Sequence, residues 1–561
     1  MRVELGLLFL VAACGGGKDN QVPVPGPAGE CIDTWESWTS GFLRTWCTAC
    51  HSAQLGTGAR YGAPAGIDFD TYADAVLLSG AIESAAGPGD GESAPRMPPV
   101  GGPTSEERAR LVDWIACGMP GEETAAVSDC ADLADHAGDT TVSSEADAIA
   151  LCAEAGTVSG DLMVSGSADL SCLCEVSGSV LVSEGDVDLS GLRAIGGDFV
   201  VGAGVFAFEL DTLAFIGGDV LVRDAVVQAV RFPKLVDVGG SLTVTALPEA
   251  ARVDISRLTT VGGSVELSDM PRFEVLLGEG YALEQIGGDL VLDDLDSWSG
   301  FYGFAYLETI GGDLRITNNN VMPRVDGFTA LASVNNIIIE GNVDLVTMDG
   351  FDLLAVIDGD LRLAGNLSLG RQDAFALLES IGGSLTIANN PTFAVLEGWG
   401  PREIGGDVLV EDLDGLNALE LLPEAVTIGG SLTLRNAPQI QRIDGLQQLT
   451  QVGGPIRFEG LSQLDSVGLS PTLSAAGGLS LVNNAALVDI TGLADLRTVT
   501  GNLEIVGNSV LSDVTPLHGV SSVTGDLIVL GNTALPAASA QALEAAIATI
   551  GGDVTVSGNG S

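Results

Sequence analysis

Basic, histidine and aromatic side chains are scarce in this chain of 561 residues. Lys and Arg number 23 against 75 Asp and Glu, which gives a net charge of −52. Such a surface repels the phosphates of nucleic acid and the headgroups of anionic lipid, so we expect neither as a partner. We expect a solvated acidic surface, with calcium binding or adaptation to a salty medium as alternatives. Only 5% of the residues are aromatic, whereas 76 are Gly. We therefore expect an aliphatic core, which suits a thin repetitive structure.

Long apolar runs are also absent, and the only apolar segment near the N-terminus, Leu5 to Ala13, is too short to span a bilayer. It leads into Val11-Ala12-Ala13-Cys14, which resembles a bacterial lipobox. The resemblance implies a signal peptide over residues 1–13 and lipidation of Cys14 as the first mature residue. Residue 15 is Gly rather than Asp, which favours the outer membrane, on its periplasmic face or at the cell surface. The Gly/Pro-rich residues 14–30 then form a tether, and the lipid is the only expected membrane contact.

All nine Cys lie at or before Cys174, and the most informative pair stands in Cys47-Thr48-Ala49-Cys50-His51. The pattern Cys-x-x-Cys-His is typical of covalent haem c attachment. Cys47 and Cys50 would form the two thioethers, and His51 would be an axial ligand of the iron. A disulfide, a zinc half-site and a thioredoxin-like motif are the alternatives. Zinc would need two further ligands, of which only His51 and His136 are near, and no preceding strand supports a thioredoxin-like motif.

Residues 31–120 form the candidate haem domain, which we expect to be small and all-α. Apolar spacing predicts a helix over 33–46, and a capping box at Thr104 predicts a second helix that ends at Cys117. With Arg96-Met97-Pro98-Pro99 between them, the layout resembles monohaem cytochromes c of the Met-Pro-Pro type. The resemblance implies one covalent haem c with Met97 as distal ligand and the Pro64 carbonyl accepting from the proximal imidazole. Met119 and His136 are rival distal ligands.

Six further Cys remain for disulfides: Cys31, Cys117, Cys130, Cys152, Cys172 and Cys174. Six Cys allow fifteen pairings, and the sequence does not choose among them. We favour Cys31 with Cys117, because they bracket the haem segment. The other four would staple the start of the repeat region, and residues 121–156 are expected to be a Cys-containing cap.

A repeat occupies residues 157–561, marked by Ile/Val-Gly-Gly-Asp/Ser-Leu/Val-x-Ile/Val/Leu at a spacing of mostly 23 to 24 residues. This period predicts a solenoid of about 18 coils, with a C-terminal cap over Ala537–Ile550. An Asn recurs after the strand of many units, and we expect these side chains to form a ladder between coils: Asn366, Asn390, Asn508, Asn532 and Asn559. The pattern resembles the receptor L domain, a relative of leucine-rich repeats, which implies a right-handed parallel β-solenoid.

No catalytic constellation stands out, and we expect His518 to be a solvated turn residue. The first functional hypothesis is one-electron transfer by a lipid-anchored c-type cytochrome, whose redox partner is unknown and whose solenoid is a docking surface. The second is cell-surface recognition, in which the solenoid binds a protein or glycan and the haem domain is accessory. The third is a haem-based sensor or peroxidase with an open distal site. We expect an electron carrier rather than an enzyme.

Overall fold

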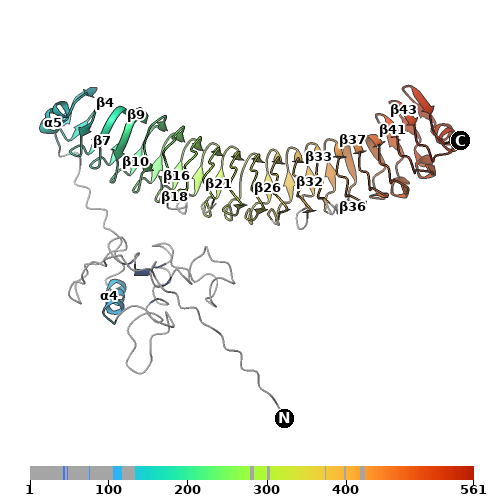
Figure 1. The fold of residues 1–561 in the computed structure, drawn as a ribbon, viewed down its shortest axis with the longest axis horizontal. Helices are drawn as coiled ribbons and strands as arrows, with labels where there is room; N and C mark the ends of the chain where they lie inside the picture. The colour runs from blue at the N-terminus through green and yellow to red at the C-terminus, as the bar shows by residue number, and fades with distance from the viewer. Residues whose placement is uncertain are drawn as a thin grey trace, which may run out of the picture. The chain divides into compact units, whose positions relative to one another are not determined.

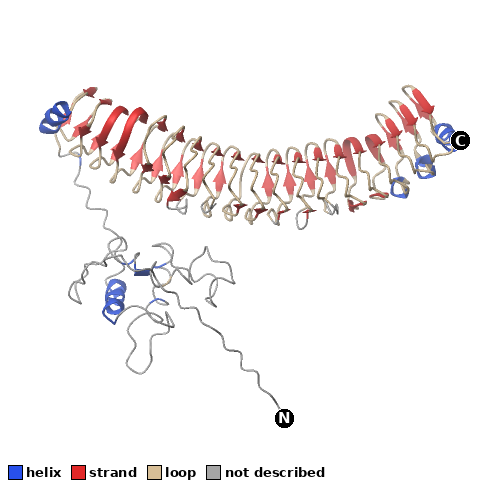
Figure 2. Cartoon of the chain, viewed as in Figure 1, coloured by secondary structure: helices blue, strands red, loops and turns tan. Residues whose placement is uncertain are grey.

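The computed structural model describes residues 39, 42–43, 47, 75, 82, 105–116, 130, 133–277, 283–299, 304–372, 374–396, 400–416, 422 and 424–560. The chain divides into two compact units, Met1–Asp129 and Cys130–Ser561. In the first unit the predicted second helix is present as α4 (Ser105–Ala116). The second unit is a parallel β-solenoid of about 17 turns, close to the 18 coils expected (Figures 1 and 2).

The main face of the solenoid is a continuous ladder of parallel strands, each in register with the strand of the next coil. In most of them the apolar residues point inward at every second position, as in Leu314–Thr317, where Leu314 and Ile316 are fully buried. The strands of this ladder are β2 (Thr140–Val142), β4 (Leu162–Ser165), β7 (Val180–Asp188), β9 (Phe199–Glu209), β11 (Val220–Arg223), β14 (Leu242–Thr245), β17 (Val265–Ser268), β20 (Leu290–Asp293), β22 (Leu314–Thr317), β24 (Ile337–Glu340), β27 (Leu361–Ala364), β30 (Leu385–Ala388), β33 (Val408–Glu411), β35 (Leu432–Arg435), β37 (Gln451–Glu459), β39 (Ala475–Val482), β41 (Leu503–Val506), β43 (Leu527–Leu530) and β45 (Val554–Ser557).

A second face carries two-residue strands that end just before each corner. They are β1 (Asp135–His136), β3 (Thr157–Val158), β6 (Glu175–Val176), β8 (Ala194–Ile195), β10 (Phe215–Ile216), β13 (Asp237–Val238), β16 (Thr260–Val261), β19 (Gln285–Ile286), β21 (Thr309–Ile310), β26 (Val356–Ile357), β29 (Ser380–Ile381), β32 (Glu403–Ile404), β34 (Thr427–Ile428), β40 (Thr498–Val499), β42 (Ser522–Val523) and β44 (Thr549–Ile550). Parallel pairing thus begins at residue 135, ahead of the residue 157 at which the sequence repeat becomes recognisable.

A third face has short strands in only some coils. They are β12 (Ala229–Arg231), β15 (Arg252–Asp254), β18 (Val275–Leu277), β23 (Arg324–Val325), β25 (Thr347–Met348), β28 (Arg371–Gln372), β31 (Val395–Leu396), β36 (Arg442–Leu446) and β38 (Ser466–Leu469), while β5 (Ala168–Asp169) pairs with β7. Helices lie near both ends: α5 (Glu145–Glu154), α6 (Ala537–Ala546) and the 3-10 helices η3 (Thr491–Leu493) and η4 (Thr515–Gly519). The helix expected in the C-terminal cap is therefore present.

The Gly-Gly pair makes the corner between the second face and the main face. A Cβ on the second Gly, such as Gly312, would overlap the Asp289 side chain of the preceding coil. That side chain accepts a hydrogen bond from the next coil's backbone, as Asp289 Oδ1 does from the Asp313 N–H at 2.8 Å. Hydrogen bonds of this kind, from Ser431 N–H among others, hold the pKa of Asp407 below its ordinary value. The second corner position is therefore Gly in most coils, with Asn335 in this place in one coil, and the corner fixes the register of successive coils.

The predicted Asn ladder is present in the coils that carry the residue. The buried Asn366 Oδ1 accepts from the N–H of Asn342 at 3.1 Å, and its Nδ2 donates to the Ile339 carbonyl at 2.9 Å. The ladder runs in two segments, Asn319 to Asn390 and Asn484 to Asn559. A buried polar side chain costs little when every donor and acceptor is paired, so the ladder ties coils together without opening the core.

Phenylalanine side chains fill the core where the Asn ladder is first established. Phe304, Phe328, Phe351 and Phe375 stack in sequence, with ring centroids 5.6, 5.1 and 4.8 Å apart. All four are fully buried. One Phe per coil thus forms a column parallel to the amide ladder, and both depend on an in-register neighbour.

Candidate functional site

Of the predicted haem residues, Cys47 is the one that the structure describes. It is 8% exposed, and its N–H donates to the Leu43 carbonyl at 2.7 Å. Cys47 belongs to an apolar cluster with Phe42, Leu43, Ala75, Ile82, Leu111 and Trp114. Cys50, His51, Met97, Pro64 and Met119 lie outside the described residues, as do Cys14, Cys31 and Cys117. The surroundings of Cys47 fit a covalent haem, because a large apolar macrocycle needs an apolar lining near its thioether bonds.

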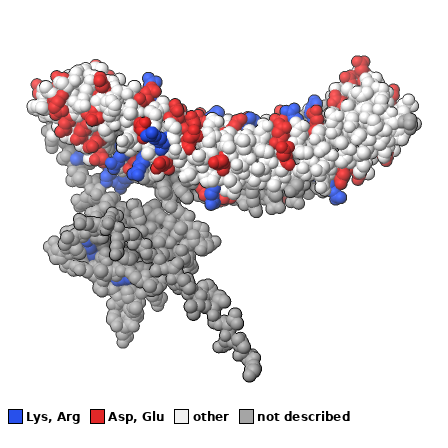
Figure 3. Space-filling view, in the orientation of Figure 1, with Lys and Arg blue, Asp and Glu red and all other residues white. Residues whose placement is uncertain are grey.

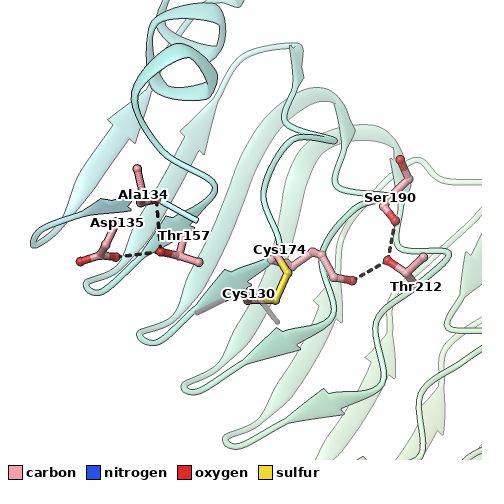
Figure 4. Close-up of a disulfide and its surroundings, with 8 residues drawn as sticks. Cys130, Ala134, Asp135, Thr157, Cys174, Ser190 and Thr212 are labelled. Atoms are coloured by element: carbon pink, nitrogen blue, oxygen red, sulfur yellow. Dashed lines mark hydrogen bonds between the residues drawn. A yellow bond between two sulfur atoms is a disulfide. The ribbon is translucent and has the colours of Figure 1, made fainter. Parts of the chain in front are cut away.

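The four Cys expected to staple the start of the repeat region form two disulfides. Cys130 bonds Cys174 with a Cα–Cα distance of 5.9 Å (Figure 4), and Cys152 of α5 bonds Cys172 with 5.7 Å. Next to the first bridge, the hydroxyl of Thr157 donates to Asp135 Oδ1 at 3.1 Å (Figure 4). The N-terminal end of the solenoid is thus closed by covalent bonds.

The two remaining histidines lie in the solenoid. His136, a rival haem ligand in our sequence analysis, is part of β1, and its carbonyl accepts from Ser159 N–H at 3.0 Å. His518 belongs to η4 and is half-buried, with an Nε2 atom that has no hydrogen-bond partner. The expectation of a solvated turn residue is therefore wrong for His518, because the coil folds it partly into the surface.

A shallow groove lies on the third face, where β12, β15 and β18 stand side by side. Its volume is about 620 Å³. Two small residues, Ala229 and Ala251, line it together with six polar side chains: Gln228, Glu249, Arg252, Arg272, Glu274 and Ser297. The backbone N–H of Ala251 donates to the Gln228 carbonyl, and that of Glu274 to the Ala251 carbonyl, so three successive coils hold the groove in register.

The two groove arginines differ in their partners. Arg272 is ion-paired with Glu249, and their side chains are 64% and 40% exposed. Arg252 is exposed and makes no ion pair with any residue that the structure describes. Its neighbour Asp254 is buried and accepts from the Ser256 N–H at 3.2 Å. One guanidinium at the groove is therefore ion-paired, and the other has no ion pair among the described residues, although Glu274 lines the same groove.

Cationic side chains concentrate around this groove. Figure 3 shows Lys and Arg gathered on the visible face in the N-terminal third of the solenoid. The rest of the visible solenoid surface is largely acidic or uncharged. Six of the 23 basic residues of the chain stand within residues 223–272: Arg223, Arg231, Lys234, Arg252, Arg257 and Arg272. The same segment holds six acidic residues, so its net charge is zero in a chain of −52. The surroundings of the groove thus repel an anion less than the average of this acidic chain.

Among the residues that the structure places, no group of three or more His, Cys, Asp or Glu side chains is arranged to hold a metal ion. None of the described helices is long and apolar enough to cross a membrane. Comparison with protein-family models, with curated proteins and with solved structures finds no match.

Proposed function

We propose that this chain is an exported, lipid-anchored electron-transfer protein that holds one covalent haem c through Cys47, Cys50 and His51. The observation that carries the proposal is the burial of Cys47, the first residue of the Cys-x-x-Cys-His motif, in an apolar cluster. The apolar side chains of Phe42, Leu43, Leu111 and Trp114 around Cys47 are the kind of lining that an apolar macrocycle needs.

Each residue of the motif has a distinct role in this proposal. Cys47 and Cys50 would hold the group covalently through their sulfur atoms, and His51 and Met97 would supply a nitrogen and a sulfur ligand to its iron. When bound, haem c would supply one-electron exchange between Fe(III) and Fe(II). The apolar cluster around Cys47 would shield the group from water, and the Met97 thioether would favour the reduced state. Two protein ligands on the iron would favour electron transfer over turnover of a substrate.

The test is the covalent haem content of the full chain, exported in a bacterium that matures c-type cytochromes. We expect haem staining at the mass of the protein on a denaturing gel, and its loss in the Cys47→Ser/Cys50→Ser double variant. The Cys152→Ser/Cys172→Ser variant is the matched control and should keep its haem. Absence of haem staining in the wild-type protein would contradict the haem assignment.

Absorption spectra separate electron transfer from the sensor or peroxidase alternative. We expect a low-spin spectrum with a weak methionine-to-iron band in the red, and loss of that band in Met97→Ala. A five-coordinate, high-spin spectrum of the wild-type protein would favour the sensor or peroxidase instead. The lipid anchor is tested separately by Cys14→Ala, which should move the protein from the membrane to the soluble fraction.

The second candidate function is recognition of an extracellular ligand through the solenoid. The observation that favours it is the groove at β12, β15 and β18 with the exposed Arg252, which makes no ion pair with the described residues. Electron transfer alone requires no such groove. The two functions are compatible, since one belongs to each unit of the chain.

A further inference from the structure

We propose that the groove on β12, β15 and β18 binds an acidic polysaccharide, with Arg252 pairing the carboxylate of a uronic acid residue. The inference rests on the recognition role proposed above and names its ligand class. It does not depend on the haem.

The repeat itself shows that Arg252 lacks a partner that equivalent arginines have. The pattern Arg-Val/Ile-Asp opens a third-face strand three times: at Arg252 in β15, Arg324 in β23 and Arg442 in β36. Arg324 pairs with Asp349 of the next coil at 3.1 Å, and Arg442 pairs with Asp465 at 3.9 Å.

Arg252 differs from Arg324 in one residue of the following coil. Asp349 comes directly after Met348, the register partner of Val325. The corresponding residue beside β15 is Leu277, the register partner of Asp254.

The partner of Arg442 stands at another place, since Asp465 directly precedes Ser466, the register partner of Arg442. The residue at that place beside Arg252 is Glu274, which lines the groove but forms no ion pair with Arg252. Arg252 thus makes no ion pair with the described residues, and a guanidinium matches an external carboxylate with two parallel hydrogen bonds.

The remaining lining selects among anionic ligands. Glu249 and Glu274 stand beside the two arginines, so a polyphosphate, which needs cations on every side, would be repelled. Carboxylate oxygens, the Gln228 amide and the Ser297 hydroxyl can instead accept from or donate to sugar hydroxyl groups. A ligand with one carboxylate among several hydroxyls matches this mixture.

A protein segment fits the groove less well. Protein interfaces depend on buried aromatic and aliphatic anchors that enter apolar pockets. Here the small residues Ala229 and Ala251 line the groove, and no large apolar side chain is among the described residues that line it. An extended sugar chain lying across three coils needs no such anchor.

The experiment measures binding of a defined oligogalacturonate to the full chain by calorimetry at low and moderate salt. We expect binding by the wild type, weakened roughly tenfold or more in Arg252→Gln, because a charge-assisted, bidentate contact is lost. Arg442→Gln is the matched control, since it removes the same charge at the equivalent place of a distant coil. Equal weakening in both variants would overturn the proposal, as would absence of binding by the wild type.

A second variant acts in the opposite direction. Glu249→Gln keeps the hydrogen-bonding capacity of the side chain and releases Arg272, so we expect affinity for oligogalacturonate to rise about two- to fivefold. A decrease would contradict the proposed role of the groove cations. Circular dichroism melting of each variant checks that the solenoid is intact.

Competitors decide the ligand class. A neutral oligosaccharide of equal length, inorganic polyphosphate and polyglutamate are measured on the same protein. Tighter binding of any of them than of oligogalacturonate overturns the uronate assignment. The haem content of each sample is recorded as well: loss of haem with intact glycan binding refutes only electron transfer, and the reverse result refutes only this inference.

Discussion

The first coils of the solenoid differ from the later ones in length and in what holds them together. After a first step of 22 residues from Asp139 to Asp161, equivalent corner residues are only 18 and 19 residues apart, from Asp161 to Ser179 and from Ser179 to Asp198. They are 24 apart later, as from Asp360 to Ser384. The first coils carry two disulfides and no ladder Asn, whereas the coils of the two ladder segments, Asn319 to Asn390 and Asn484 to Asn559, have no Cys.

This difference follows from the neighbouring coils that an Asn ladder requires and a disulfide does not. An amide ladder works only between in-register neighbours, because each Asn side chain accepts from and donates to the backbone of the coil before it, as Asn366 does with Asn342 and Ile339. The first coil has no coil before it. A disulfide closes a loop within the first coils and needs no further neighbour, so it stabilises the end of the array where a ladder is least effective.

The largest effect is expected from removing one rung of the ladder in the long coils. Asn366→Leu leaves the N–H of Asn342 and the carbonyl of Ile339 buried without these partners. We expect the free energy of unfolding to fall by about 4 kcal/mol, since each such group costs about 1–3 kcal/mol. Urea unfolding measures the loss. Asn320→Leu, at an exposed neighbouring position, is the control and should change it by less than about 0.5 kcal/mol.

Removing a disulfide should destabilise the first coils of the solenoid. Cys152→Ala/Cys172→Ala opens a link between residues 20 apart in sequence, for which we expect a cost of about 3 kcal/mol. Hydrogen exchange should accelerate over residues 135–200 and stay unchanged beyond residue 319. Uniform acceleration along the whole solenoid would show that the disulfide does not act locally.

A smaller effect concerns the residue that follows each main-face strand, where the backbone is left-handed. Asn, Asp or Gly occupies this place in other coils, as at Asn318 (φ 56°) and Gly341 (φ 72°), but Ala246 has φ 53°. We expect Ala246→Gly to raise the free energy of unfolding by about 1 kcal/mol, because it removes the steric cost of Cβ. Gly341→Ala should lower it by at least about as much. Thermal melting of the pair measures both signs, and a loss in Ala246→Gly would contradict the backbone argument.

The smallest expected effect on the free energy of unfolding depends on pH and comes from Asp294. Burial, followed by repulsion from Asp296, Asp269 and Asp293, raises the pKa of Asp294 above its ordinary 3.8. The folded state thus binds this proton more tightly than the unfolded state, so the ionised carboxylate destabilises the fold at pH 7, and that cost is lost as the pH falls through the raised pKa. We expect Asp294→Asn to stabilise by less than about 0.5 kcal/mol at pH 7 and by nothing below pH 3.8. A gain that persists in acid would point to the backbone rather than to the charge.

The sequence predicts the repeating part of this molecule well because the constraints recur. Gly-Gly corners, alternating Leu and Ile, and ladder residues such as Asn366 each appear many times, and all were expected. The start at residue 135 was not, since β1 and β2 lack the Gly-Gly marker that makes a coil recognisable.

The groove could not be predicted, because it depends on differences between coils rather than on the repeat. Arg252 looks like Arg324 and Arg442 in the sequence. Only the register shows that Leu277 stands where Arg324 finds Asp349. A signal was nonetheless present in the concentration of Lys and Arg within residues 223–272 of an acidic chain. The haem residues, Cys47 included, stay a prediction.

The Gly-Gly corners restrict changes in the length of the solenoid to whole coils. Each corner fits the side chain of the coil before it, as Gly312 fits Asp289, so a coil can be added or removed only as a whole. Excision of one complete period of 24 residues, 360–383, joins Gly359 to Ser384 and keeps the register of the corners. A cut that shifts a strand by one residue moves its inward residues to the surface. The distance between the two ends of the solenoid can therefore change over evolution only in single-coil steps.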